Sequence, residues 1–226
     1  MATISFMTNI EKAKLLKLLY QHRAMGFEYF NEYRPLAQES TIALPQNLQE
    51  LQKAVSMCHL CPLAKSRKNV VFGSGNLKAT LMFIGDNPGV SEDESGEIFM
   101  GRAGDLLTKI IENVLLLKRE DVYIANIIKC KTPENRVPTL EEVATCKPYL
   151  MQQIQSINPR IIVALGSTSF HHLTGEYDTP IDKIHGSVLN FGKAKLVPTF
   201  HPSFLLRNPS AKKDVYADML KVRSLL

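Results

Sequence analysis

The sequence contains no tryptophan, only four cysteines among 226 residues, and no long apolar run. Its longest apolar stretches, such as "IIVAL" and "VLLL", are far shorter than the roughly 20 residues that a membrane-spanning helix requires. The opening residues, "MATISFMTNIEKAKLLKLLY", lack the apolar core and small-residue cleavage site of a secretory signal peptide. These absences predict a cytoplasmic protein with no membrane partner, in which disulfides are not expected to persist.

Composition sets only broad limits. Hydrophobic residues make up 45% of the chain and charged residues 22%, which is typical of a globular protein of one sizeable domain. The formal net charge is +5, from 27 Lys and Arg against 22 Asp and Glu. An excess this small fits a polyanionic partner such as DNA, but an ordinary solvated surface would look the same.

Apolar runs alternate with helical segments from about residue 79 onward. Four short runs, at 80–84, 122–125, 161–165 and 196–200, are separated by stretches with helical periodicity. This alternation predicts an α/β fold in which a four-stranded, mainly parallel sheet carries helices on both faces. Pro198 in the fourth run favours an edge strand, because proline cannot donate a ladder hydrogen bond.

The first part of the chain has a different pattern. Apolar spacing and a Thr8/Glu11 capping box predict an amphipathic helix over 8–22, and a second helix follows Pro45. We therefore expect an N-terminal helical extension, residues 1–47, followed by an α/β domain, residues 48–226.

Polar residues stand at the end of each predicted strand. Asp86 and Asn87 follow the first, Asn126 ends the second, Ser167 follows the third and His201 follows the fourth. In open α/β sheets, ligands bind beyond the carboxyl ends of the strands. A carboxylate, two amides and an imidazole at these positions predict a binding site, although loops are commonly polar for solubility alone.

The four cysteines are unevenly spaced. Cys58 and Cys61 form a C-x2-C pair, whereas Cys130 and Cys146 stand in a C-x15-C arrangement. Four thiols suit one metal centre, and this spacing leaves iron–sulfur and zinc equally open. Four unrelated buried cysteines are the third reading.

Several motifs together resemble family 4 uracil-DNA glycosylases, the iron–sulfur branch of the uracil-DNA glycosylase superfamily. They are "CHLCPL" (58–63), "GDNPGVSEDESGEIFMGRAGDLL" (85–107), "YIANIIKCKTPENRVPTLEEVATCKPYL" (123–150), "PRIIVALGSTS" (159–169) and "PTFHPSFLLRNP" (198–209). The resemblance implies an α/β/α sandwich that acts as a monomer and releases uracil from DNA, leaving an abasic site for base excision repair. It also implies a structural [4Fe-4S] cluster on the four cysteines.

The resemblance assigns roles within a uracil pocket. Phe99 would stack on the extruded base and Asn126 would read its edge. His201 would donate to O2, where negative charge grows as the glycosidic bond breaks. Glu92 and Asp93 would line the pocket near the base and the attacking water.

The resemblance also implies DNA contacts. The segment "SFLLR" (203–207) would form a wedge, with Leu205 and Leu206 entering the base stack and Arg207 binding a phosphate. The helix start at Ser167 offers backbone amides to a phosphate, or is a plain helix cap.

One loop departs from the family pattern. The family usually has G-E-A-P-G or G-E-G-P-G where this chain has "GDNPG", with Asp86 and Asn87. In other branches an Asn at this place orients the water, which predicts that role for Asn87 with Asp86 as support; alternatively, Asn87 only closes the turn. The chain also lacks an inserted basic loop with histidine, so we expect no covalent adduct.

Two other classes compete with this interpretation. A non-catalytic nucleic-acid-binding module with a four-cysteine metal site would bind DNA without releasing a base. A small iron–sulfur electron carrier would have no need of Phe99 or His201.

Overall fold

The computed structural model describes residues 44–226, and Leu44–Leu226 form one compact unit. The predicted helix over 8–22 lies outside the described residues, and the domain boundary between residues 47 and 48 stays a prediction. Within 44–226, no helix is both long enough and apolar enough to cross a membrane.

The core of the molecule is a six-stranded sheet in the order β1-β3-β2-β4-β6-β5. Its four central strands run parallel to their neighbours. They are β2 (Leu81–Gly85), β3 (Tyr123–Asn126), β4 (Ile161–Leu165) and β6 (Ala194–Thr199). These strands are the four predicted apolar runs, so the mainly parallel α/β fold is confirmed.

The predicted number of strands is wrong, because two short antiparallel strands complete the sheet. β1 (Ser74–Gly75) pairs with β3 at one edge, and β5 (Leu189–Phe191) pairs with β6 at the other. With two and three residues, they are too short to show an alternating pattern in the sequence.

β6 is also not the edge strand that Pro198 suggested, since β5 covers it. The pairing with β5 involves only residues 194–196 of β6, so Pro198 lies beyond its end. Because Lys195 donates its backbone N–H toward β4, Pro198 turns its nitrogen the opposite way, where no ladder bond is needed. A proline is therefore tolerated locally within an interior strand.

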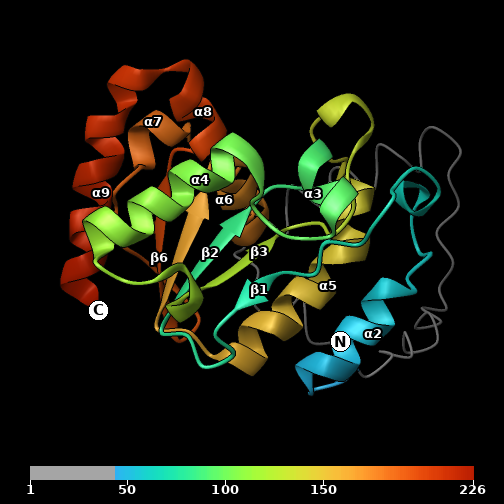
Figure 1. Cartoon of the computed structure of the whole chain (residues 1–226). Coiled ribbons are helices and arrows are strands. Elements are labelled where there is room, and N and C mark those ends of the chain that lie inside the picture. Colours follow the sequence, from blue (N-terminus) through green and yellow to red (C-terminus); the bar gives the residue numbers. More distant parts are fainter. Residues whose placement is uncertain (1–43) are drawn as a thin grey trace, which may run out of the picture. The chain divides into compact units, whose positions relative to one another are not determined.

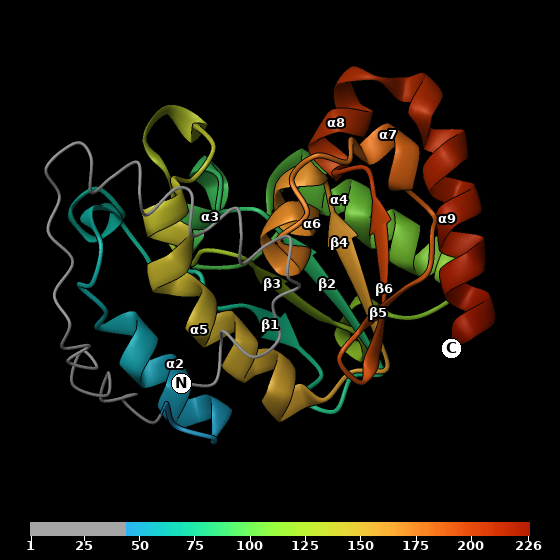
Figure 2. The same ribbon diagram turned by 180° about the vertical axis from the view of Figure 1, so that it is seen from behind.

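Helices cover both faces of the sheet, as predicted. Alternate strand residues such as Phe83 and Val163 pack under α4 (Gly101–Ile110), α8 (Pro202–Arg207) and α9 (Lys212–Leu225). Residues of opposite parity, such as Met82 and Ile162, pack under α5 (Leu140–Ile157) and α6 (Ser167–Thr174). Figure 1 shows α4 in front of the sheet, and Figure 2 shows α5 and α6 in front of its reverse face.

Shorter elements fill the connections. α2 (Leu48–Ser56) packs on α5, and α3 (Val90–Ser95) and α7 (Ile181–Ile184) are single short helices. The remaining turns are η2 (Pro62–Lys65), η3 (Ile111–Leu115), η4 (Arg119–Asp121), η5 (Pro133–Asn135) and η6 (Pro209–Ala211).

The strand register aligns the polar strand ends. Gly85 of β2 lies opposite Asn126 of β3, and Leu165 of β4 lies opposite Thr199 of β6. The chain leaves β2 toward α4 and leaves β4 toward α6, which lie on opposite faces of the sheet. A crevice is expected at such a switch point, beyond the carboxyl ends of the strands.

Candidate active site

A cavity of about 640 Å³ opens at this edge of the sheet. Seven of the residues singled out from the sequence line it: Asp86, Asn87, Glu92, Phe99, Asn126, His201 and Arg207. It is also lined by Ser203 of the predicted wedge segment, and by residues that sequence reasoning missed, among them Ser91, Met100, Arg102 and Asn135. Loops that are far apart in the chain thus converge on one concave site.

Asn126 ends β3 with its side chain in the cavity. The residue is only 2% exposed. Its Oδ1 is the single buried side-chain polar atom, among the described residues, that has no hydrogen-bond partner. A buried carbonyl without a partner costs about 1–3 kcal/mol, so a ligand that supplies a donor is the expected compensation.

Phe99 forms a wall of the cavity beside Asn126. A Cβ at Gly85 would lie 2.5 Å from Asn126 Oδ1 and 2.9 Å from the Phe99 ring, so only glycine leaves room for both. Phe99 itself has φ of +51°, a left-handed conformation that is strained for a non-glycine residue. The local backbone is thus shaped to present this aromatic ring.

His201 caps the N-terminus of α8, and this cap determines its tautomer. Nδ1 accepts the backbone N–H of Ser203 at 3.1 Å and lies 2.7 Å from the Ser203 hydroxyl. Nδ1 is therefore unprotonated, and the ring proton sits on Nε2. Burial lowers the pKa of His201, which keeps the imidazole neutral. Its ring centroid is 5.7 Å from that of Phe99.

Ser169 of α6 holds the Asp86 carboxylate in place. Its Oδ1 accepts the backbone N–H and the hydroxyl of Ser169, at 3.0 and 3.1 Å. Burial raises the pKa of Asp86, while the hydrogen bonds from Ser169 oppose that rise. A carboxyl group whose burial is only partly offset is typical of functional sites.

Asn87 joins two loops at the cavity wall. Its Nδ2 donates to Pro88 O at 3.1 Å and to Thr132 Oγ1 at 3.3 Å. The Thr132 hydroxyl donates in turn to Arg136 O at 2.7 Å. The turn-closing alternative therefore has a structural basis, and the water-orienting role stays a prediction.

The two adjacent acids of α3 face different ways. Glu92 lines the cavity, and its Oε2 accepts the backbone N–H of Gly89 at 3.0 Å. Asp93 is buried away from the cavity lining, and its Oδ1 accepts the backbone N–H groups of Lys68 and Asn69 at 2.9 and 3.3 Å. The carboxylate of Asp93 therefore anchors the neighbouring loop, and its role near the base stays a prediction.

The residues of the predicted wedge also differ in their exposure. Leu205 is 1% exposed and belongs to the core beneath α8, so the structure does not present it to DNA. Leu206 is 37% exposed, and the exposed Arg207 lines the cavity. Ser167 is the first residue of α6 and does not line the cavity.

The four cysteines form no disulfides and lie in one neighbourhood. The charges of Cys61 and Cys58 act on Cys130, and those of Cys130 and Cys58 act on Cys146. Arg67 contacts two of the cysteines through its terminal nitrogens: Nη1 donates to Cys130 Sγ at 3.2 Å, and Nη2 donates to Cys58 O at 2.6 Å. Burial raises the pKa of Cys146 to about 11, so its thiolate needs a nearby cation or metal.

Two further groups face these thiols. The Tyr149 hydroxyl donates to Cys58 Sγ at 3.8 Å, and the charge of the buried Lys129 acts on both Cys146 and Cys130. Across residues 44–226, no group of three or more His, Cys, Asp or Glu side chains is arranged to hold a metal ion. The donors around the thiols nevertheless suit an anionic group.

Comparison with known proteins agrees with this geometry. A profile of the Uracil DNA glycosylase superfamily matches residues 72–221. A type-4 uracil-DNA glycosylase of Thermotoga maritima is 43% identical over 182 residues, covering 79% of this chain and 94% of that protein. One of Saccharolobus solfataricus is 42% identical over 187 residues, covering 80% and 87%. A type-5 uracil-DNA glycosylase of Pyrobaculum aerophilum is 28% identical over 144 residues, covering 57% and 63%.

The fold and cavity define an α/β protein with a cavity at its strand ends. The match over residues 72–221 and the identity to type-4 relatives add the family: the chain belongs to the uracil DNA glycosylase superfamily. The resemblance stated from the motifs is confirmed.

Proposed function

We propose that this protein is a monofunctional uracil-DNA glycosylase. It hydrolyses the N-glycosidic bond of uracil in DNA, releases uracil, and leaves an abasic site for base excision repair. The unpaired Oδ1 of Asn126, buried in the cavity beside a neutral His201, carries this proposal. The type-4 relatives support it.

Asn126 explains the choice of base. Its Oδ1 accepts the N3–H of uracil and its Nδ2 donates to O4. Cytosine presents an acceptor at N3 and a donor at N4, so it would leave both amide groups wrongly paired in a buried site. Such mismatches discriminate by as much as about 10⁴–10⁵-fold. The base must first leave the duplex, and the Phe99 ring provides the surface on which it stacks.

His201 acts on the leaving group. As the bond between C1′ and uracil N1 breaks, the electron pair moves into the uracil ring and its carbonyl oxygens. The Nε2–H of His201 donates to O2, and one such fixed donor contributes about 3–4 kcal/mol of transition-state stabilisation. Water adds to C1′, with Asn87 orienting it and Asp86 in support, and the proton that the water loses neutralises the departing uracil anion. No protein nucleophile is required, so uracil leaves free and no covalent adduct forms.

Two exposed residues of α8 would supply the DNA contacts. Leu206 enters the base stack and Arg207 binds a phosphate. The backbone amides at Ser167 offer a second phosphate contact at the start of α6. Action as a monomer in the cytoplasm is part of this proposal, because the family resemblance implies the first and the lack of a secretory signal in the sequence suggests the second.

We further propose that Cys58, Cys61, Cys130 and Cys146 hold a [4Fe-4S] cluster. The cluster would be structural, joining the segment before β1 to the end of β3 and to α5. The identity to type-4 relatives supports a cluster rather than zinc, because the family that the motifs resemble is the iron–sulfur branch. Charge-transfer absorption in the visible range, with iron and sulfide analysis, tests this; a colourless zinc protein would contradict it.

The activity is tested on DNA containing one uracil, single-stranded or opposite G or A, followed by alkali cleavage. We expect strand scission after alkali for uracil and none for cytosine or thymine. His201→Ala should reduce release about 10²–10³-fold, as loss of one oxyanion donor does. His171→Ala is the matched control, because the His171 ring hydrogen-bonds to Thr179 O and does not line the cavity. Binding without release would favour the non-catalytic nucleic-acid-binding module instead.

A further inference from the structure

The Phe99 ring is presented by a tightly bent backbone. Phe99 has φ of +51°, and Gly101, the first residue of α4, has φ of +71°. A Cβ at Gly104 would lie 1.7 Å from Phe99 O, so the helix packs directly against this carbonyl. Left-handed backbone costs about 1–2 kcal/mol in a residue with a side chain, so neighbouring groups must hold it in place.

Arg119 holds this bend from outside the cavity. It lies in η4, the turn before β3, and its Nη2 donates to Ile98 O at 2.7 Å and to Phe99 O at 3.3 Å. Its Nη1 donates to Thr108 Oγ1 on α4 at 2.9 Å. The guanidinium therefore links the Phe99 backbone to the helix that follows it.

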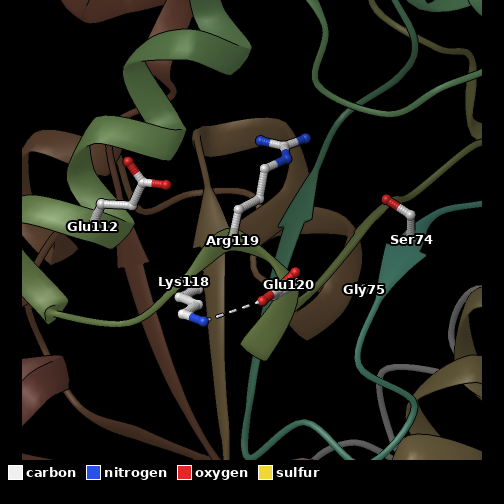
Figure 3. Close-up of a pocket in the computed structure, with 6 residues that line it drawn as sticks. All are labelled: Ser74, Gly75, Glu112, Lys118, Arg119 and Glu120. Carbon is white, nitrogen blue, oxygen red and sulfur yellow. Dashed lines mark ion pairs between the residues drawn. The ribbon is translucent and has the colours of Figure 1, made fainter.

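The surroundings of Arg119 are consistent with a role in holding the Phe99 backbone. In Figure 3 its guanidinium points away from the ion pair between Lys118 and Glu120, whose atoms are 3.6 Å apart. Burial lowers the pKa of Arg119, and the carboxylates of Asp105, Glu97 and Glu112 oppose that shift. A planar fork can reach two carbonyls and a hydroxyl at once, whereas the single ammonium of lysine cannot match that geometry.

We propose that Arg119 is a positioning residue for base stacking: it fixes the backbone of Ile98 and Phe99 so that the Phe99 ring faces the extruded base. Arg119 does not line the cavity that holds Phe99 but a separate one, together with Ser74 and Glu112, so it would act on the base only through Phe99. The inference rests on the proposed glycosylase function.

The experiment is a double-mutant cycle on single-turnover uracil release, with wild type, Arg119→Lys, Phe99→Ala and the double variant. We expect Arg119→Lys to slow release about 10-fold, less than the 10²-fold that a 1 Å displacement costs. In the Phe99→Ala background the same change should have about a 2-fold effect or less, because residues acting through one contact are not additive. Binding to abasic-site DNA, which has no base to stack, should stay unchanged.

Arg223→Lys is the matched control, since Arg223 donates to a helix-end carbonyl, Val114 O at 3.3 Å, away from the cavity. If Arg119→Lys does not fold, Thr108→Val tests the same clamp by removing one acceptor, with a smaller loss of rate expected. A wild-type rate in the folded variant, or effects that multiply in the double variant, would overturn the proposal. A wild type that releases no uracil would instead overturn the proposed function.

Discussion

Two buried side-chain amides in this protein differ in their hydrogen bonding. Gln153, in α5, is completely buried and fully paired: its Oε1 accepts Lys129 Nζ at 2.6 Å, and its Nε2 donates to Phe72 O and to Tyr123 Oη. Asn126 is almost as deeply buried, yet its Oδ1 has no partner.

The contrast is sharper because one group serves both residues. The Lys129 ammonium that binds Gln153 also donates to the backbone carbonyl of Asn126, at 2.8 Å. The backbone of Asn126 is thus fixed while its side chain is left open toward the cavity. A saturated amide contributes to stability, whereas an open amide on a fixed backbone is prepared for a ligand.

Replacing each amide in turn tests this contrast, and these substitutions have the largest expected effects. Asn126→Ala should slow uracil release about 10²–10³-fold. It should leave the free energy of unfolding unchanged or higher, because an unpaired group is lost. Gln153→Ala should lower the free energy of unfolding by about 3 kcal/mol, since it strands a buried ammonium. The release rate of that variant should stay near wild type where it is folded. Urea unfolding and single-turnover assays measure both quantities, and equal effects of the two changes on rate would contradict the distinction.

Substitution of Asp86 should have a smaller effect on uracil release. Its carboxylate accepts a hydrogen bond from Ser169, and burial raises its pKa. Asp86→Asn keeps an oxygen for Ser169 and removes the buried charge, so the fold should gain about 1 kcal/mol. If Asp86 supports the attacking water, release should fall by about 10-fold, within the range of acid–base groups. Thermal melts and rates test the pair of outcomes. A variant that is less stable and fully active would contradict both.

The pH dependence of stability provides a third test. The pKa of His201 is lowered by burial, so the unfolded chain takes up this proton at a higher pH than the folded protein does. The stability that neutral His201 contributes is present above pH 6.5 and is lost as the pH falls below it. Asp86, with its raised pKa, works in the opposite direction. Urea unfolding from pH 7 to pH 5 should therefore show a shallower loss of stability in His201→Asn than in wild type. An identical slope would contradict the assignment.

The smallest effect is expected at Ser203. Its backbone N–H, not its hydroxyl, fixes Nδ1 of His201 as an acceptor. Ser203→Ala keeps that backbone donor and loses only the hydroxyl contact, so release should slow by about 5-fold or less, the equivalent of about 1 kcal/mol. A loss as large as that of His201→Ala would mean that the hydroxyl sets the tautomer.

Adjacent residues show where prediction from sequence stops. The four long strands and the order of helices follow from apolar periodicity, and the polar strand ends follow from parallel topology. Yet Glu92 and Asp93 look alike in the sequence, as do Leu205 and Leu206. Each pair lies on a helix, where one step turns the side chain by about 100°, so one member reaches the site and the other is buried elsewhere.

The supporting residues were harder to predict for another reason. Ser169 binds Asp86 across 83 positions of sequence, and Arg119 binds the Phe99 backbone across 20. No periodicity connects such partners, because their contact depends on how strands and turns are assembled in space. The "GSTS" helix start was the only local signal for Ser169, and the sequence gives no local signal for Arg119.

The two short edge strands have a consequence for the behaviour of the protein at high concentration. A long, flat sheet edge presents unpaired backbone groups that other chains can extend, which is a common route to fibrous aggregation. Here β1 and β5 close the sheet with only two and three residues. The flanking Lys193 and Lys195 add charge beside β5. The buried parallel strands are thus shielded from intermolecular pairing, and the sheet gives no template for growth.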